Sequence, residues 1–136
     1  MPKTIIVPVA LAQIEKAQAM LDVARQLGGA DGEIVLVTVI EEVPGYVAAE
    51  LPAGLLENAA DEARGELRTL ARNAGMELAV EVRKGNPATA ILAVASERNA
   101  DVIVIASHRP GLQDYFLGST AARVVRHAKC SVHVIR

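Results

Sequence analysis

Short runs of β-branched residues alternate along this chain with longer segments in which apolar residues recur every three or four positions. The short runs are typical of strands, and the longer periodic segments of amphipathic helices. We expect five strands, over residues 4–9, 33–40, 78–82, 102–106 and 131–135. We expect four helices between them, over residues 14–27, 56–74, 87–95 and 119–128. Strict alternation of strands and helices predicts an α/β fold: a doubly wound parallel sheet with right-handed crossovers and helices on both faces.

The candidate ligand site lies at one edge of this sheet. Small ligands of doubly wound sheets bind at the carboxyl ends of the strands, beside the point where the strand order reverses. The candidate loops are therefore those that follow Val9, Ile40, Arg83 and Ala106. Residues 41–54 are rich in proline and glycine and have few periodic apolar positions, so they predict a long loop. Loops of this length are often functional.

Length and composition narrow the possible functions. The 136 residues suit one domain, so we treat residues 1–136 as a single unit. Aromatic residues make up only 2% of the chain and its formal net charge is -2, so neither base stacking nor phosphate neutralisation supports binding to nucleic acid. No apolar run approaches the ~20 residues that cross a bilayer, and no export signal precedes the first strand, so we expect no membrane partner. The single cysteine, Cys130, excludes an intrachain disulfide and fits the reducing cytoplasm.

The most informative segment joins the fourth strand to the last helix. Gly118, Ser119 and Thr120 stand where that helix begins, and the free main-chain N–H groups of a helix N-terminus bind anions. Gly118 lets phosphate oxygens approach the main chain, the two hydroxyls add donors, and Arg109 adds a fixed positive charge. The alternative is that Ser119 is simply the N-cap of the helix. The segment therefore predicts either a phosphate site or an ordinary helix start.

Several motifs resemble those of the universal stress protein family. They are Ile6-Val7-Pro8-Val9, Gly85-Asn86-Pro87, Ala106-Ser107-His108-Arg109-Pro110, Leu117-Gly118-Ser119 and the run Arg123-Val124-Val125-Arg126-His127 that leads into the last strand. The Ser-His-Arg-Pro loop is most similar to the F-type subgroup of that family. The resemblance spans the whole chain, and it implies the strand order 3-2-1-4-5.

The resemblance also implies a function. It implies a cytoplasmic stress-response sensor or regulator that binds an adenine nucleotide, ATP first, with Mg²⁺ as a candidate companion ion. The residues expected to contact the nucleotide follow the first, second and fourth strands or begin the last helix. They are Pro8, Val9, Ala10, Val39, Ala106, Ser107, His108, Arg109, Gly118, Ser119 and Thr120.

Two departures from the family pattern bear on nucleotide affinity. Ala10 stands where family members usually carry an aspartate near the adenosine end of the nucleotide. Ala106 replaces the first glycine of the family's Gly-x2-Gly-x9-Gly-Ser/Thr pattern, and the second glycine is absent from a shortened loop. Loss of a typical hydrogen bond costs about 0.5–1.5 kcal/mol, or about 2–13-fold in affinity. We therefore expect weaker binding or an altered nucleotide preference, and the alternative function is a nucleotide-independent interaction module of the same fold.

The sequence carries no arrangement of residues that supports an enzyme or a metal site. His108, His127 and His133 fall in a loop, a helix end and a strand, without metal-ligand spacing or a neighbouring carboxylate. His127 suits the C-terminal end of a helix dipole, and His108 is the one histidine that could contact a phosphate. Cys130 lacks a positioned base, although Lys129 could lower its pKa. Slow ATP hydrolysis or autophosphorylation is the least favoured function.

The last strand predicts an assembly. In the strand order implied by the resemblance it lies at one edge of the sheet, and an apolar edge strand aggregates unless it is paired, covered or charged. His133 and Arg136 supply the polar side chains that could oppose such aggregation. Two copies related by a twofold axis could pair these edges antiparallel and bury Val132 and Val134. We expect a homodimer through the last strand, with a monomer as the alternative.

Overall fold

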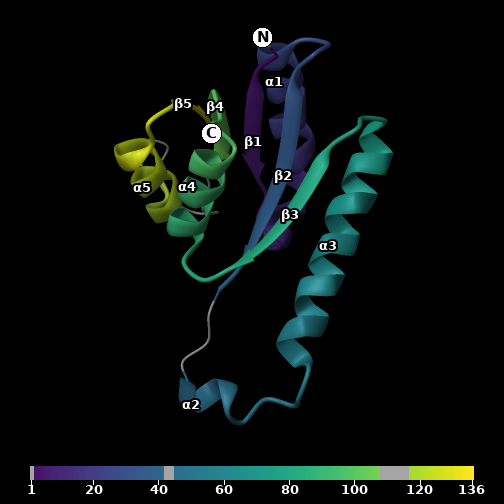
Figure 1. The fold of residues 1–136 in the computed structure, drawn as a ribbon, viewed down its shortest axis with the longest axis vertical. Helices are drawn as coiled ribbons and strands as arrows, with labels where there is room; N and C mark the ends of the chain where they lie inside the picture. The colour runs from purple at the N-terminus through teal and green to yellow at the C-terminus, as the bar shows by residue number, and fades with distance from the viewer. Residues whose placement is uncertain (1, 42–44, 108–116) are drawn as a thin grey trace.

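The computed structural model describes residues 2–41, 45–107 and 117–136 of the chain. Its strands are β1 (Thr4–Pro8), β2 (Glu33–Ile40), β3 (Ala79–Lys84), β4 (Val102–Ala106) and β5 (Ser131–Ile135). Its helices are the 3-10 helix η1 (Leu11–Lys16) and the α-helices α1 (Ala17–Gly28), α2 (Gly45–Ala48), α3 (Leu55–Ala74), α4 (Pro87–Glu97) and α5 (Ser119–His127). Strands and helices alternate along the chain (Figure 1).

The strands form one parallel sheet in the order β3-β2-β1-β4-β5. This order, with helices on both faces, confirms the predicted doubly wound α/β fold. The order reverses at β1, because β2 pairs with one of its sides and β4 with the other. The carboxyl ends of β1 and β4 therefore flank the point at which such sheets bind ligands.

Two apolar layers hold the sheet between the helices. On one face, Ile5 of β1 belongs to the same buried cluster as Leu21 of α1 and Leu67 of α3. On the other face, Ile6 belongs to the cluster of Val94 of α4 and Val124 of α5. Successive residues of β1 thus point into opposite layers and both are fully buried. This explains why the strand is a continuous apolar run rather than an alternation of apolar and polar residues.

Local signals in the sequence set where three helices begin or end. The Asn86 side chain accepts a hydrogen bond from the Thr89 N–H (3.1 Å), and Pro87 is the first residue of α4. Gly75 ends α3 in the left-handed region (φ 66°), and Gly29 ends α1 at φ 67°. These turns direct the chain back towards the sheet.

The structure departs from the sequence prediction mainly in the segments after β1 and β2. Residues 11–16 form η1 instead of the start of an α-helix, because Ala10 offers no capping side chain and Gln13 leaves the helical region (φ -129°, ψ 42°). Gly45–Ala48 forms α2 within the segment expected to be a loop, and Figure 1 shows it beyond the carboxyl end of β2. β3 also continues past its expected end at residue 82, because it pairs with β2 as far as Ile40.

An ion-pair network ties the edge strand β3 to the C-terminal end of α4. Arg83 donates hydrogen bonds to Glu81 (2.7 Å) and to Glu97 (2.8 Å). Arg98 donates to the other carboxylate oxygen of Glu81 and to Glu33 at the start of β2 (3.2 Å). The network lies at the edge of the sheet, away from the carboxyl ends of the central strands β1 and β4.

Candidate functional site

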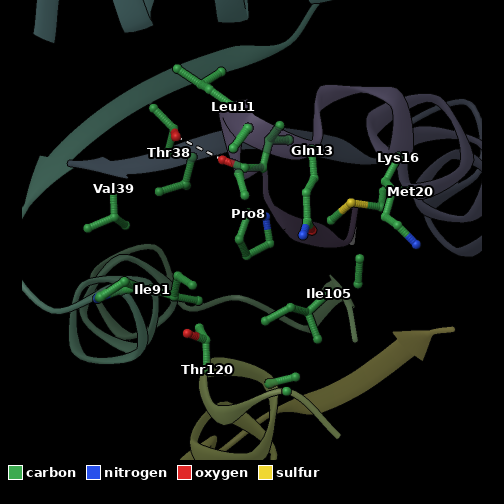
Figure 2. A pocket seen from close by; sticks show the side chains of 18 of the residues that line it. Pro8, Leu11, Gln13, Lys16, Met20, Thr38, Val39, Ile91, Ile105 and Thr120 are labelled. Atoms are coloured by element: carbon green, nitrogen blue, oxygen red, sulfur yellow. Dashed lines mark hydrogen bonds between the residues drawn. The ribbon is translucent and has the colours of Figure 1, made fainter. Parts of the chain in front are cut away.

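A cavity of about 580 Å³ opens at the carboxyl ends of β1, β2 and β4 (Figure 2). Small-ligand sites in proteins span ~300–1,000 Å³, so the cavity can hold a nucleotide-sized molecule. Its walls come from these strand ends and from η1, α1, α4 and α5. The cavity therefore lies where the strand order predicts a ligand site.

The structure brings most of the predicted contact residues to this cavity. Those that line it are Pro8, Val9, Ala10, Val39, Ala106, Gly118, Ser119 and Thr120. Ser107 does not line it: the residue is only 8% exposed, and its hydroxyl oxygen accepts a hydrogen bond from the Gly118 N–H (3.3 Å). Ser107 therefore holds the start of α5 in place. His108 and Arg109 lie outside the described residues.

The start of α5 presents main-chain N–H donors at the cavity wall, and no described residue of the helix accepts from them. Gly118 is the N-cap, with an extended backbone (φ -61°, ψ 154°), and no side chain of the described residues caps the helix. The Ala122 N–H donates to the Gly118 carbonyl (2.8 Å), which leaves the N–H groups of Ser119, Thr120 and Ala121 without acceptors within the helix. The alternative in which Ser119 is itself the N-cap is therefore wrong. A helix start of this kind is suited to a phosphate group.

A buried hydroxyl fixes the end of β1 against β2. The Thr38 hydroxyl donates a hydrogen bond to the Val9 carbonyl (2.8 Å), and the Val9 N–H donates to the Val37 carbonyl (2.7 Å). These bonds hold two cavity-lining strand ends at a fixed separation. The sequence analysis missed Thr38, and the one signal that could have found it is a polar residue inside the apolar run of β2.

The remaining walls combine apolar residues with a few polar side chains. Ile91 of α4 and Ile105 of β4 form an apolar part of the lining (Figure 2). Gln13 and Lys16 come from η1, and Glu41 follows β2. The sequence analysis missed Gln13 and Lys16 because it placed both in or beside an ordinary amphipathic helix, whereas a 3-10 turn carries them to the ligand side of the sheet.

The thiol of Cys130 and the described histidines, His127 and His133, lie away from this cavity. Cys130 lines a second cavity of about 400 Å³ near the start of β5, together with His127 and Lys129. Burial raises the pKa of the Cys130 thiol, so the expected lowering by Lys129 is wrong and the thiol stays protonated at neutral pH. His127 lies in the last turn of α5, as predicted, and His133 is exposed on β5.

Within residues 2–41, 45–107 and 117–136, no group of three or more His, Cys, Asp or Glu side chains could hold a metal ion. No helix formed by the same residues is long and apolar enough to cross a membrane.

This chain is similar to known proteins in both sequence and fold. The family model described as Universal stress protein family matches residues 1–136. Universal stress protein G of Salmonella typhimurium is 32% identical over 145 residues, a match that covers 100% of both chains. Among solved structures, universal stress protein UspA from Lactobacillus plantarum is 26% identical with a TM-score of 0.78, covering 98% of this chain and 97% of that one. A universal stress protein in complex with cAMP is 20% identical, with a TM-score of 0.67 and coverage of 99% and 97%, and shares the fold. The chain belongs to the universal stress protein family.

Proposed function

We propose that this chain is a cytoplasmic stress-response sensor or regulator that binds an adenine nucleotide, ATP first, at the carboxyl ends of β1 and β4. The observation that carries the proposal is the start of α5, where Ser119 and Thr120 open onto a cavity of nucleotide size. Nucleotide occupancy would set the conformation or the partners of the protein. We assign it no catalytic step.

The phosphates of the nucleotide belong at the start of α5. The N–H groups of Ser119 and Thr120 have no helical acceptor, and their hydroxyls add two further donors. His108 and Arg109 follow Ser107 in the sequence, ahead of α5, and we propose that they make additional phosphate contacts. Mg²⁺ would enter with the phosphates and take its other ligands from water, as it commonly does.

The adenine base belongs among the apolar residues of the lining. Val39, Ile91 and Ile105 form such a surface between the ends of β2 and β4 and the side of α4. Apolar contacts around the base, combined with a few polar groups at the phosphates, are typical of ligand pockets. The cAMP complex of a universal stress protein with the same fold supports an adenine nucleotide as the ligand class.

The proposed assembly is a homodimer joined through β5. This strand is an edge of the described sheet. The Ser131 N–H donates to the Asp101 carbonyl (3.3 Å) and the Ser107 N–H to the Ile135 carbonyl (2.8 Å), so the odd-numbered residues of β5 direct their main-chain groups towards β4. The main-chain groups of the half-buried Val132 and Val134 therefore face outward, where a second copy could pair with them.

Thermal unfolding with and without ATP and Mg²⁺ tests the proposed function. A ligand at 100 times its dissociation constant adds about 2.7 kcal/mol, which corresponds to a rise in Tm of roughly 5–10 °C for a chain of this size. If ATP, ADP, AMP and cAMP all leave Tm unchanged at millimolar concentration, the proposal is wrong. The chain would then act as a nucleotide-independent interaction module, as the substitution at Ala10 and the shortened glycine loop allow.

A further inference from the structure

A cationic side chain lines the cavity on the opposite side from the start of α5. Lys16, the last residue of η1, belongs to this wall, and Gln13 lies beside it. Figure 2 shows both residues on the far side of Pro8 from Thr120. The cavity therefore offers hydrogen-bond donors at two ends, with apolar residues between them.

The positive charge of Lys16 is not neutralised by the residues that the structure describes. Lys16 is half-buried, and it forms no ion pair or hydrogen bond with any residue in the ranges 2–41, 45–107 and 117–136. Glu41, the other charged residue of the described lining, lies at the end of β2 and does not pair with it. An anionic group bound in this part of the cavity would meet an ammonium group that no described carboxylate neutralises.

Lys16 lies at the junction of η1 and α1. It is the last residue of η1, its backbone is helical (φ -84°, ψ -13°) and α1 begins at the next residue, so Lys16 does not cap a free helix end. Its side chain makes no capping bond and is left available to a bound anion.

We propose that Lys16 forms a second anion subsite, and that the preferred ligand is an adenine nucleotide with a phosphate on the 2′ or 3′ oxygen of its ribose in addition to its 5′ phosphate. This inference rests on the proposed function. If the 5′ phosphate lies at α5 and the base on Ile91, the wall that Ala10, Gln13 and Lys16 contribute to the lining is left for the ribose hydroxyls.

The charge of that wall suits a phosphorylated ribose. In dinucleotide-binding sheets a carboxylate beside the ribose selects the free hydroxyl, whereas a basic residue accepts a phosphate in its place. The wall between β1 and α1 contributes Ala10, Leu11, Ala12, Gln13 and Lys16 to the lining, and none of these is acidic. The free hydroxyls of an unmodified ribose would find no carboxylate in this wall.

Calorimetric titration of the full chain with three probes tests the inference. They are adenosine 5′-monophosphate, adenosine 2′,5′-bisphosphate and adenosine 3′,5′-bisphosphate, and the two isomers distinguish the oxygen that carries the second phosphate. We expect one bisphosphate to bind about 3–20-fold more tightly than the monophosphate, and the advantage to shrink as salt is raised. In Lys16→Met and Lys16→Gln this advantage should disappear, and the affinity for the bisphosphate should fall to that for the monophosphate. Lys3→Ala, at the opposite end of β1, is the matched control and should change neither affinity.

The stability of the same variants provides an independent readout. Because the Lys16 side chain forms no ion pair or hydrogen bond with any described residue, both Lys16 variants should melt within about 2 °C of the wild type when no ligand is present. Equal binding of all three probes by the wild type overturns the inference and leaves the proposed function standing. Failure of all three probes to bind overturns the inference, and the same titration with ATP then decides whether the proposed function stands. A bisphosphate preference that survives in the Lys16 variants removes Lys16 from the site and also overturns the inference.

Discussion

The Thr38 hydroxyl and the Val9 carbonyl lie 2.8 Å apart and form a buried hydrogen bond between the ends of β1 and β2, which open into the cavity at the carboxyl ends of the strands. Val9 follows the last paired residue of β1, so its carbonyl depends on a side chain for a donor. A buried carbonyl without a donor is costly, and this bond therefore both stabilises the sheet and sets the width of the cavity.

Replacing Thr38 with valine should lower the free energy of unfolding by about 1–3 kcal/mol, because the substitution keeps the volume and leaves the Val9 carbonyl buried without a donor. Chemical denaturation measures this loss. Thr69→Val is the matched control: the Thr69 hydroxyl bonds to the Gly65 carbonyl on the exposed side of α3. Its effect should stay within about 0.5 kcal/mol. An equal loss of unfolding free energy in Thr38→Val and Thr69→Val would show that the buried hydrogen bond stabilises the protein no more than the exposed one.

Replacing Gly118 with valine should abolish nucleotide binding and leave the protein folded. A Cβ at this position meets no described atom within 4 Å, so the side chain would extend into the space that a phosphate needs at the start of α5. Valine is a poorer N-cap than glycine, and we expect the empty protein to lose no more than about 1 kcal/mol. Thermal unfolding without and with ATP and Mg²⁺ measures the stability of the empty protein and the stabilisation by the nucleotide.

Gly65→Ala, in an equally open position on α3, is the control and should keep the full stabilisation by ATP. A Gly118→Val protein that responds to ATP like the wild type would place the site elsewhere.

The fold could be predicted from periodicity, whereas only part of the site could. The runs around Ile6 and Val104 are apolar at every position because both faces of the sheet are covered, and this pattern identifies parallel strands. The glycine and hydroxyl residues at the start of α5 could likewise be recognised from their position after a strand. Lys16 could not be placed in the same way. Its place in the lining follows an irregular backbone at Gln13, and no pattern of apolar residues predicts such a break.

The ion-pair network on β3 should make stability depend on pH through Glu81. Burial alone would raise the pKa of this carboxyl, but hydrogen bonds from Arg83 and Arg98 outweigh it and hold the pKa below its ordinary value of 4.5. A carboxyl with a lowered pKa in the folded state stabilises the protein fully above its unfolded value, and this stabilisation is lost as pH falls through the folded value.

Glu81→Gln should therefore lower the free energy of unfolding by about 1–3 kcal/mol at pH 7. The difference from the wild type should narrow below pH 4.5, as the carboxyl of the wild type becomes protonated. Urea denaturation at several pH values measures both effects. Glu66→Gln, an exposed residue of α3, serves as the control and should show little difference from the wild type at any pH. A Glu81→Gln difference that is the same at pH 7 and at pH 3 would contradict the assignment.

The edge strand β5 should control assembly. If two copies pair antiparallel along this edge, the outward main-chain groups of Val134 take part in the new ladder. Val134→Pro removes one outward N–H and leaves the hydrogen bonds to β4 in place, and proline is tolerated on an edge strand in this orientation.

Val134→Lys adds a charge to the strand. Because the Val134 side chain is half-buried beneath α5, thermal unfolding of this variant must show that it is still folded. Sedimentation at micromolar concentration should give a dimer for the wild type and a monomer for both variants. A monomeric wild type contradicts the proposed assembly. A dimer that survives both substitutions also contradicts it, because loss of a donor in Val134→Pro and addition of a charge in Val134→Lys should each weaken a ladder formed through β5.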